Sequence, residues 1–139
     1  MSDTATQYEK PLPVPSEVSA PYWKGLASGE IRLQRCADCH RFVFYPRSVC
    51  PYCLGERLEW VSTSGRGRVY SYTLVRRAMN PAFAADVPYV FAIVELDEGP
   101  RVTTNIVGCA PEEVRVDMRV KAAYDSVTSE LALLKFEPE

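Results

Sequence analysis

The sequence has little of what a membrane protein or a secreted protein requires. Its longest apolar run without a charge covers only eight residues, Val87 to Val94. A membrane-spanning helix needs about 20 apolar residues, so no such helix is expected. The first ten residues are polar and lack the basic-then-apolar pattern of a secretion signal. We therefore expect an intracellular, cytoplasmic protein without a membrane partner.

Catalytic motifs are also missing. The chain has no GxSxG sequence, no Ser/His/Asp set and no glycine-rich phosphate loop, and it contains a single histidine. We infer no catalytic residue, and we expect that the chain is not catalytic on its own.

The composition is that of a folded protein with one domain or two very small ones. Of 139 residues, 47% are hydrophobic and 24% are charged, which is typical of globular chains. Residues 31–80 carry nine Arg against three acidic residues, whereas residues 81–139 carry five basic against eleven acidic residues. The basic segment indicates either a local site for an anion or a partner, or a solvated surface of mixed charge.

Four of the five cysteines form the strongest motif. Cys36 and Cys39 make one CxxC pair, Cys50 and Cys53 make a second, and ten residues separate the pairs. Two such turns, joined by a short hairpin, aim four thiolates at one point and complete a tetrahedral zinc shell with no open position. The motif therefore predicts one structural zinc ion per chain, coupled to folding by on the order of 10 kcal/mol.

Other interpretations of the cysteines explain less. Disulfides need an oxidising compartment, and a redox CxxC does not need two copies at this spacing. The run from Cys36 to His40 also spells the CxxCH signature of covalent haem, but haem would leave Cys50 and Cys53 unexplained. The fifth cysteine, Cys109, lacks an evident activating base and is interpreted as a small buried hydrophobe.

The chain divides into three predicted parts. Residues 1–15, with alternating prolines from Pro11 to Pro15, are expected to form a flexible extended arm. Residues 16–61 are expected to hold a short helix and the zinc ribbon, and residues 62–139 an OB-fold domain.

The helix is predicted between Ser19, as its N-cap, and Gly29, as its stop signal. Tyr22, Trp23 and Leu26 give it an apolar face. That face either packs on the body of the protein or is presented to another subunit.

The rest of the chain is expected to be mainly β. Alternating apolar residues predict strands at 31–35, 58–61, 68–75, 89–96, 101–107, 119–124 and 130–136. One helical turn is expected at 111–114. Three strands, a short helical insert and two further strands are the order of a five-stranded OB-fold barrel.

The connection between the first two barrel strands is the candidate binding segment. Its 13 residues, 76–88, are many for a hairpin loop. Met79 and Phe83 make it apolar, and Arg76 and Arg77 at its start can receive phosphates. It is either a surface for a ligand or partner, as the equivalent loop often is in OB-folds, or a loop folded back over the barrel mouth.

Several short motifs together resemble one known family. In chain order they are Pro21-Tyr22-Trp23, Gly29-Glu30-Ile31, Leu33-Gln34-Arg35-Cys36, Cys39, Pro46-Arg47, Cys50-Pro51-Tyr52-Cys53, Glu59-Trp60-Val61, Ser64-Gly65-Arg66-Gly67, Val69-Tyr70-Ser71-Tyr72-Thr73, Val94-Glu95-Leu96-Asp97-Glu98-Gly99 and Pro100-Arg101. This set is similar to the acyl-CoA-associated zinc-ribbon and OB-fold proteins, formerly a domain of unknown function, over about residues 20–137. Two positions depart from the family pattern, because His40 and Asp117 stand where glycine is common.

The resemblance implies a fold and a role. The fold is an N-terminal helical segment, a rubredoxin-like zinc ribbon and a C-terminal OB-fold. Family members are accessory subunits of thiolase-like enzymes, among them acyltransferases and the retro-aldolases of steroid side-chain breakdown. There the small protein docks on a thiolase-like or lipid-transfer-protein-like subunit, giving a hetero-oligomer, and helps to form the acyl-CoA channel.

Three functions are weighed on this basis. The preferred one is a non-catalytic accessory subunit of a thiolase-fold enzyme, with Arg76, Arg77, Met79, Phe83, Tyr22 and Trp23 as candidate ligand or partner contacts. The alternative is a nucleic-acid-binding protein, in which Tyr70, Tyr72 and Phe91 stack bases, unless they belong to the barrel core. The acidic barrel half disfavours this alternative. A stand-alone acyl-CoA hydrolase or transferase would need a base and a nucleophile that the chain lacks.

Overall fold

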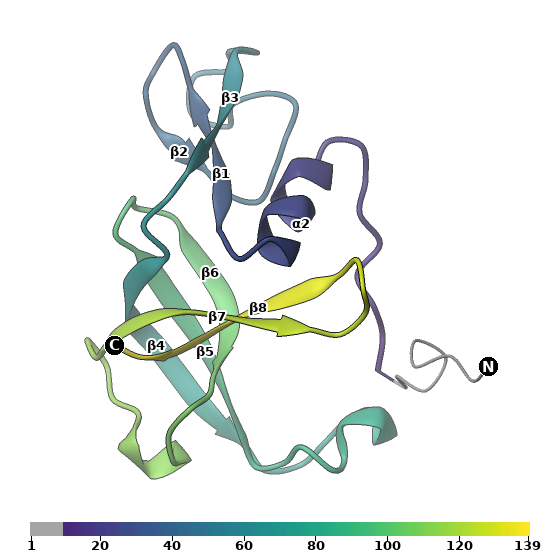
Figure 1. Ribbon diagram of the computed structural model, residues 1–139. Helices are drawn as coiled ribbons and strands as arrows, with labels where there is room; N and C mark the ends of the chain where they lie inside the picture. Colours follow the sequence, from purple (N-terminus) through teal and green to yellow (C-terminus); the bar gives the residue numbers. More distant parts are fainter. Residues whose placement is uncertain (1–9) are drawn as a thin grey trace, which may run out of the picture.

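The structure is a computed structural model that describes residues 10–139. Its upper part in Figure 1 is a short helix, α2 (Ala20–Ala27), beside a three-stranded antiparallel sheet. The sheet has the order β2-β1-β3. Its strands are β1 (Arg32–Cys36), β2 (Phe42–Val43) and β3 (Leu58–Ser62).

The lower part of the molecule is a closed barrel with the strand order β4-β5-β6-β8-β7 (Figure 1). Its strands are β4 (Arg66–Val75), β5 (Tyr89–Leu96), β6 (Arg101–Ile106), β7 (Arg119–Ser126) and β8 (Ala132–Pro138). Two short 3-10 helices interrupt the connections, η1 (Pro81–Phe83) and η2 (Pro111–Glu113). The predicted mainly β fold, with a zinc ribbon followed by a five-stranded OB-fold barrel, is confirmed.

The helix begins and ends near the predicted residues, but its cap differs. Ser19 occupies the N-cap position without a side-chain hydrogen bond to the helix. Its hydroxyl oxygen instead accepts a hydrogen bond from the backbone N–H of Ser16 at 2.9 Å. Gly29 follows the helix with a φ of 84°, a conformation that glycine adopts without steric cost.

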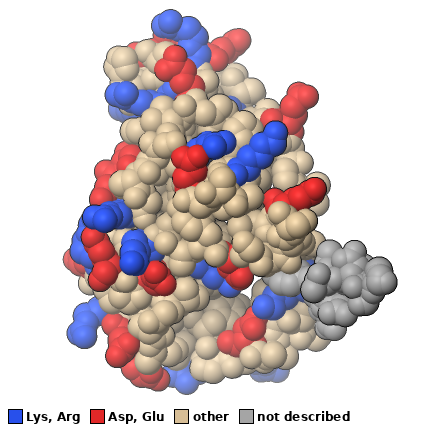
Figure 2. All heavy atoms as spheres, viewed as in Figure 1, with Lys and Arg blue, Asp and Glu red and all other residues tan. Residues whose placement is uncertain are grey.

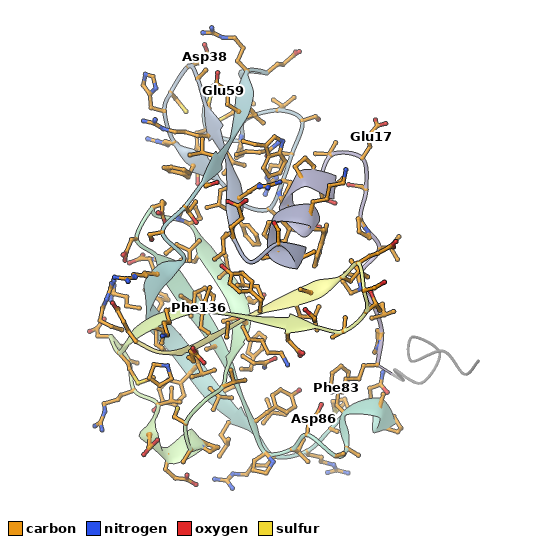
Figure 3. All side chains as sticks on the ribbon, in the orientation of Figure 1. Glu17, Asp38, Glu59, Phe83, Asp86 and Phe136 are labelled. Carbon is orange, nitrogen blue, oxygen red and sulfur yellow. The ribbon has the colours of Figure 1, made fainter. Side chains whose placement is uncertain are left out.

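One hydrophobic core joins the helix, the base of the ribbon and the barrel. Leu26, Ile31 and Leu33 belong to the same buried cluster as the barrel interior, where Phe136 is completely buried (Figure 3). A second, small cluster lies at the tip of the ribbon and consists of Cys36, Val43 and Cys50. The tip therefore has almost no apolar core of its own and needs another source of stability.

Strand β4 contains a β-bulge. Val69 pairs with Val94 and Ser71 pairs with Ile93, so that Tyr70 is an extra residue between two ladder positions. The ring of Tyr70 lies under the guanidinium group of Arg101, 3.8 Å from its centroid.

Folding brings the basic and acidic segments of the sequence together. Arg66 pairs with Glu139 at 3.2 Å, and Arg68 pairs with Glu95 at 2.7 Å. On the visible face in Figure 2, basic and acidic side chains are interleaved instead of forming two separate fields. Much of the charge separation along the sequence is therefore cancelled locally. Among the described residues, no helix is long and apolar enough to cross a membrane.

Candidate metal centre and binding surface

The four cysteines of the two CxxC pairs meet at the tip of the ribbon. Their sulfur atoms all lie within 4.8 Å of one another. The Cys36 and Cys53 sulfurs are 3.5 Å apart, and the Cys39 and Cys50 sulfurs are 3.7 Å apart. Four sulfurs at about 2.3 Å from a zinc ion would be about 3.8 Å apart along each tetrahedral edge. The arrangement thus matches a single four-coordinate ion.

Local backbone geometry directs these sulfurs inward. The backbone N–H of Cys39 donates to the Cys36 sulfur at 3.5 Å, and that of Tyr52 donates to the Cys50 sulfur at 3.4 Å. Such donors stabilise thiolates, the form that binds metal. All five cysteines are free of disulfides.

The donor set fits zinc in a structural role. Four thiolates complete a tetrahedral shell and leave no position for water or substrate. Cys36 and Cys50 are completely buried, whereas Cys53 is exposed at the surface. The zinc-ribbon domain therefore has four cysteines positioned for one metal ion, as the sequence predicted.

Neither His40 nor Cys109 joins this centre. His40 is exposed beside the first turn. Cys109 is half-buried after β6, and burial, followed by the negative charge of Glu113, raises the pKa of its thiol. A protonated thiol is a poor nucleophile, and Cys109 packs against the hydrophobic core, so both observations favour a packing role.

The segment between β4 and β5 carries the other candidate contacts. Arg76 and Arg77 are exposed, and no carboxylate among the described residues lies within ion-pair distance of either. Met79 is 95% exposed. Phe83, on η1, is partly covered by Lys10, whose Nζ lies 5.7 Å from the ring centroid.

Lys10 fixes this segment to the start of the described chain. Its Nζ pairs with Asp86 at 2.5 Å, and Figure 3 shows Phe83 and Asp86 close together at the lower end of the molecule. Asn80 accepts a hydrogen bond from the N–H of Ala82 at 2.9 Å and caps η1. The connection is therefore a folded turn with an exposed methionine and two exposed arginines.

The two aromatic residues of α2 have different environments. Tyr22 is 4% exposed and contacts the rings of Trp23 and Phe44 at centroid distances of 5.1 and 5.6 Å. Burial, with smaller effects of the Tyr45 and Tyr124 phenols, raises the pKa of Tyr22 above its usual range. Tyr22 thus packs within the chain. Trp23 is half-buried and donates from Nε1 to the Tyr45 hydroxyl at 3.1 Å.

Two clefts meet on the outside of the barrel. One, of about 400 Å³, reaches Lys10, Phe83 and Asp86, and the other, of about 290 Å³, reaches Tyr22 and Trp23. They share four lining residues: Phe91, Asn105, Leu133 and Lys135. The structure therefore connects the helix and the β4–β5 segment, which the sequence proposed as separate candidate contacts, through one shared region.

The sequence contained a signal for this shared region. Strand β5 reads Tyr-Val-Phe-Ala-Ile-Val, with apolar side chains on both faces. A strand that is half-exposed usually alternates apolar with polar residues, so apolar residues on both faces indicate that both faces are covered. Phe91 belongs to the outer set and is nevertheless 43% exposed.

Comparison with known proteins agrees with this architecture. The family model described as "ChsH2, rubredoxin-like zinc ribbon domain" matches residues 23–59, and the one described as "ChsH2, C-terminal OB-fold domain" matches residues 60–125. The chain belongs to the ChsH2 (DUF35) family. The resemblance noted from the sequence motifs is thereby confirmed.

Relatives in the ChsH2 family include parts of larger proteins. The chain is 35% identical over 129 residues to a Thermomonospora curvata protein named "Probable enoyl-CoA hydratase alpha subunit", covering 93% of this chain but only 40% of that protein. It is 32% identical over 118 residues to "Benzoylsuccinyl-CoA thiolase subunit BbsA" of Thauera aromatica, covering 84% of this chain and 72% of that subunit.

A solved structure in the ChsH2 family is also similar. It is titled "Ltp2-ChsH2(DUF35) aldolase", and its matching chain has 35% sequence identity and a TM-score of 0.81. The match covers 91% of this chain and 98% of that chain. The similarity thus extends over the ribbon and the barrel together.

Proposed function

We propose that this chain is a non-catalytic subunit that docks on a thiolase-fold enzyme acting on acyl-CoA thioesters, in acyl transfer or in retro-aldol cleavage. The match to the ChsH2 chain of an aldolase, over nearly its whole length, is the observation that carries the proposal. The thiolase subunit of Thauera aromatica supports the same class of partner. The substrate class includes steroid side-chain CoA esters, since one Mycobacterium tuberculosis relative is named for a pregnadiene-carboxyl-CoA substrate.

The chemistry of the chain supports a subunit without a reaction of its own. Its metal centre is closed by four sulfurs, and its remaining cysteine is held as a thiol. On this proposal the partner supplies the reacting groups, and this chain stabilises the partner and helps to shape the channel for CoA and the acyl group. The reduced cysteines fit a cytoplasmic location.

Residues of the β4–β5 segment are proposed to contact the ligand or the partner. Arg76 and Arg77 can form forked hydrogen bonds to phosphate or carboxylate groups. Met79 offers an exposed, flexible apolar side chain that adapts to a partner surface.

Co-expression tests the proposal directly. The chain is produced together with a thiolase-fold subunit from the same genome, and the mixture is separated by size-exclusion chromatography with light scattering. We expect a co-eluting complex that turns over an acyl-CoA substrate, whereas this chain alone does not. Separate elution of the two proteins, or turnover by the isolated chain, would contradict the proposal.

A single substitution tests whether the β4–β5 segment contacts the partner. Met79→Ser is expected to weaken the complex at least several-fold without lowering the melting temperature, because Met79 makes almost no contacts within the chain. Val116→Ser, at another exposed apolar residue outside the segment, is the matched control. Equal effects of the two substitutions on the complex would remove Met79 from the docking surface.

A further inference from the structure

The outer side of the barrel sheet formed by β4, β5 and β6 is free of charge over three successive rows. The rows follow from the strand register: Ser71, Ile93 and Thr103; Thr73, Phe91 and Asn105; Val75 and Tyr89. We call these eight residues the uncharged face. Ser71, Thr73, Phe91 and Thr103 in this set are exposed, and the other four are half-buried.

The next outward row of the same sheet consists of charged residues. There Arg68, Glu95 and Arg101 lie side by side across the three strands. Glu95 accepts hydrogen bonds from Arg68 at 2.7 Å and from Arg101 at 3.2 Å, which lowers the pKa of its carboxyl group. Arg68 also pairs with Asp117, so the row forms an ionic border to the uncharged face.

The neighbouring strands β8 and β7, which follow β6 around the barrel, have a different composition. Outward positions of β7 and β8 carry Lys121, Asp125, Lys135 and Glu137, which pair across the two strands. A water-facing sheet normally looks like this, with opposite charges interspersed. Loss of charge together with exposed aromatic side chains is instead the composition of the centre of a protein interface.

We infer that the uncharged face is where the proposed thiolase-fold subunit docks, with an apolar patch of that subunit against Phe91 and an acidic edge against Arg76 and Arg77. This inference rests on the proposed function and assigns it a surface. Arg76 and Arg77 follow the last row directly, since β4 ends at Val75. Among the described residues neither has an ion-pair partner, and their charges are the complement that an acidic edge requires.

The same charges argue against a second copy of this chain as the occupant. The carboxylates that border the face are already engaged: Glu95 with Arg68 and Arg101, and Asp86 with Lys10. A second copy would therefore bring no free acidic group from this region to Arg76 and Arg77. A nucleic acid is disfavoured as well, because Arg76 and Arg77 lie at one end and the three rows beside them contain no cation to contact further phosphates.

Two clefts beside Phe91 offer positions where side chains of the partner can bind. The two clefts of about 400 and 290 Å³ are both lined by Phe91. An apolar side chain of the partner that enters either cleft would cover Phe91, with Lys135 at the edge of both clefts. Aromatic residues enclosed in this way carry a large part of interface binding energy.

The test places a negative charge at the centre of the face. Thr73→Glu and Phe91→Glu are compared with Val116→Glu, an exposed apolar position outside the face. Binding of each full-length, zinc-loaded variant to the thiolase-fold subunit is measured by isothermal titration calorimetry. Thr73 is exposed and makes no side-chain hydrogen bond among the described residues, so we expect this substitution to leave the fold intact.

We expect both face variants to raise the Kd at least tenfold and the control to change it by less than twofold. Melting temperature and zinc content, measured in parallel, should match those of the parent protein for Thr73→Glu. Arg76→Glu with Arg77→Glu should also raise the Kd and reduce its dependence on salt.

The outcomes separate the inference from the proposed function. If the parent chain does not bind the thiolase-fold subunit, the proposed function fails and this inference fails with it. If the parent binds and both face variants bind equally well, only the inference is overturned. Self-association of the parent chain, or binding of single-stranded DNA, that Thr73→Glu abolishes would also overturn it.

Discussion

His40 and Leu54 occupy equivalent positions in the two turns that hold the metal centre. The N–H of His40 donates to the carbonyl oxygen of Cys36 at 2.8 Å, and that of Leu54 donates to the carbonyl oxygen of Cys50 at 2.9 Å. Both residues have positive φ angles, 67° and 65°. Each therefore adopts the left-handed conformation, which costs a residue with a Cβ atom about 1 kcal/mol or more.

This geometry predicts a stabilising substitution. Leu54→Gly should raise the free energy of unfolding of the zinc-loaded protein by about 0.5–1 kcal/mol, because glycine relieves the strain and Leu54 is 75% exposed. His40→Gly should act in the same direction. Urea unfolding measures the change, and Leu54→Ala, which keeps a Cβ atom, is the control. A gain as large with alanine as with glycine would contradict the strain argument.

At Gly67, by contrast, replacing glycine is expected to destabilise the protein. A Cβ atom at Gly67 would lie 2.3 Å from the carbonyl oxygen of Glu95 on the neighbouring strand. Gly67→Ala should therefore force β4 and β5 apart and lower the free energy of unfolding by about 3 kcal/mol. Thr73→Ala, at an exposed position of the same strand, should change it by less than about 1 kcal/mol. A tolerated Gly67→Ala substitution, measured by the same urea titration, would show that the strands adjust.

Metal removal is expected to unfold the ribbon tip before the barrel. The tip cluster of Cys36, Val43 and Cys50 is separate from the core that contains Ile31 and Leu33. Hydrogen exchange followed by mass spectrometry should show that a strong chelator removes protection around residues 36–58 and leaves it in β5 and β6. Elemental analysis before chelation should give one zinc ion per chain. Simultaneous loss of protection in the barrel would mean that the tip and the barrel unfold together.

The ion pair between Asp97 and Arg119 predicts a pH effect. The two carboxylate oxygens accept from Arg119 at 2.9 Å each, and this contact lowers the pKa of Asp97 below its usual value. A lowered pKa in the folded state stabilises the protein above the unfolded pKa of about 3.9, and the effect is lost as the pH falls through the folded pKa.

Asp97→Asn should therefore be less stable than the parent protein near pH 6, and the difference should shrink towards zero as the pH falls below about 4. Urea midpoints at several pH values measure this difference. Asp125→Asn, which removes a contact to Lys135 at the other end of β7, provides a comparison. A difference that is independent of pH would assign the effect of Asp97 to something other than its charge.

The sequence predicted those features that depend on local spacing. The CxxC pairs encode their own turns, so that Cys36, Cys39, Cys50 and Cys53 could be assigned together without knowledge of the fold. Strand positions followed from alternation, and β5 was predicted with the observed bounds. His40 and Asp117, which stand where the family commonly has glycine, both have positive φ angles in the structure.

Features that depend on distant pairing could not be predicted in this way. The apolar face of α2 is compatible with packing or with docking, and only the folded chain shows that Tyr22 is buried against Phe44. The uncharged face depends on the register of three strands. That register includes an extra residue at Tyr70, which alternation alone does not reveal.

The bulge at Tyr70 makes the first barrel strand tolerant of a change in length. Because Val69 and Ser71 each keep their own partner on β5, removal of the intervening residue would leave the pairing on both sides in phase. A one-residue deletion there would remove the aromatic ring that contacts Arg101. Every later side chain of β4 would still point to the same face of the sheet. A β4 strand that is shorter by one residue at this point can therefore keep the same barrel pairing.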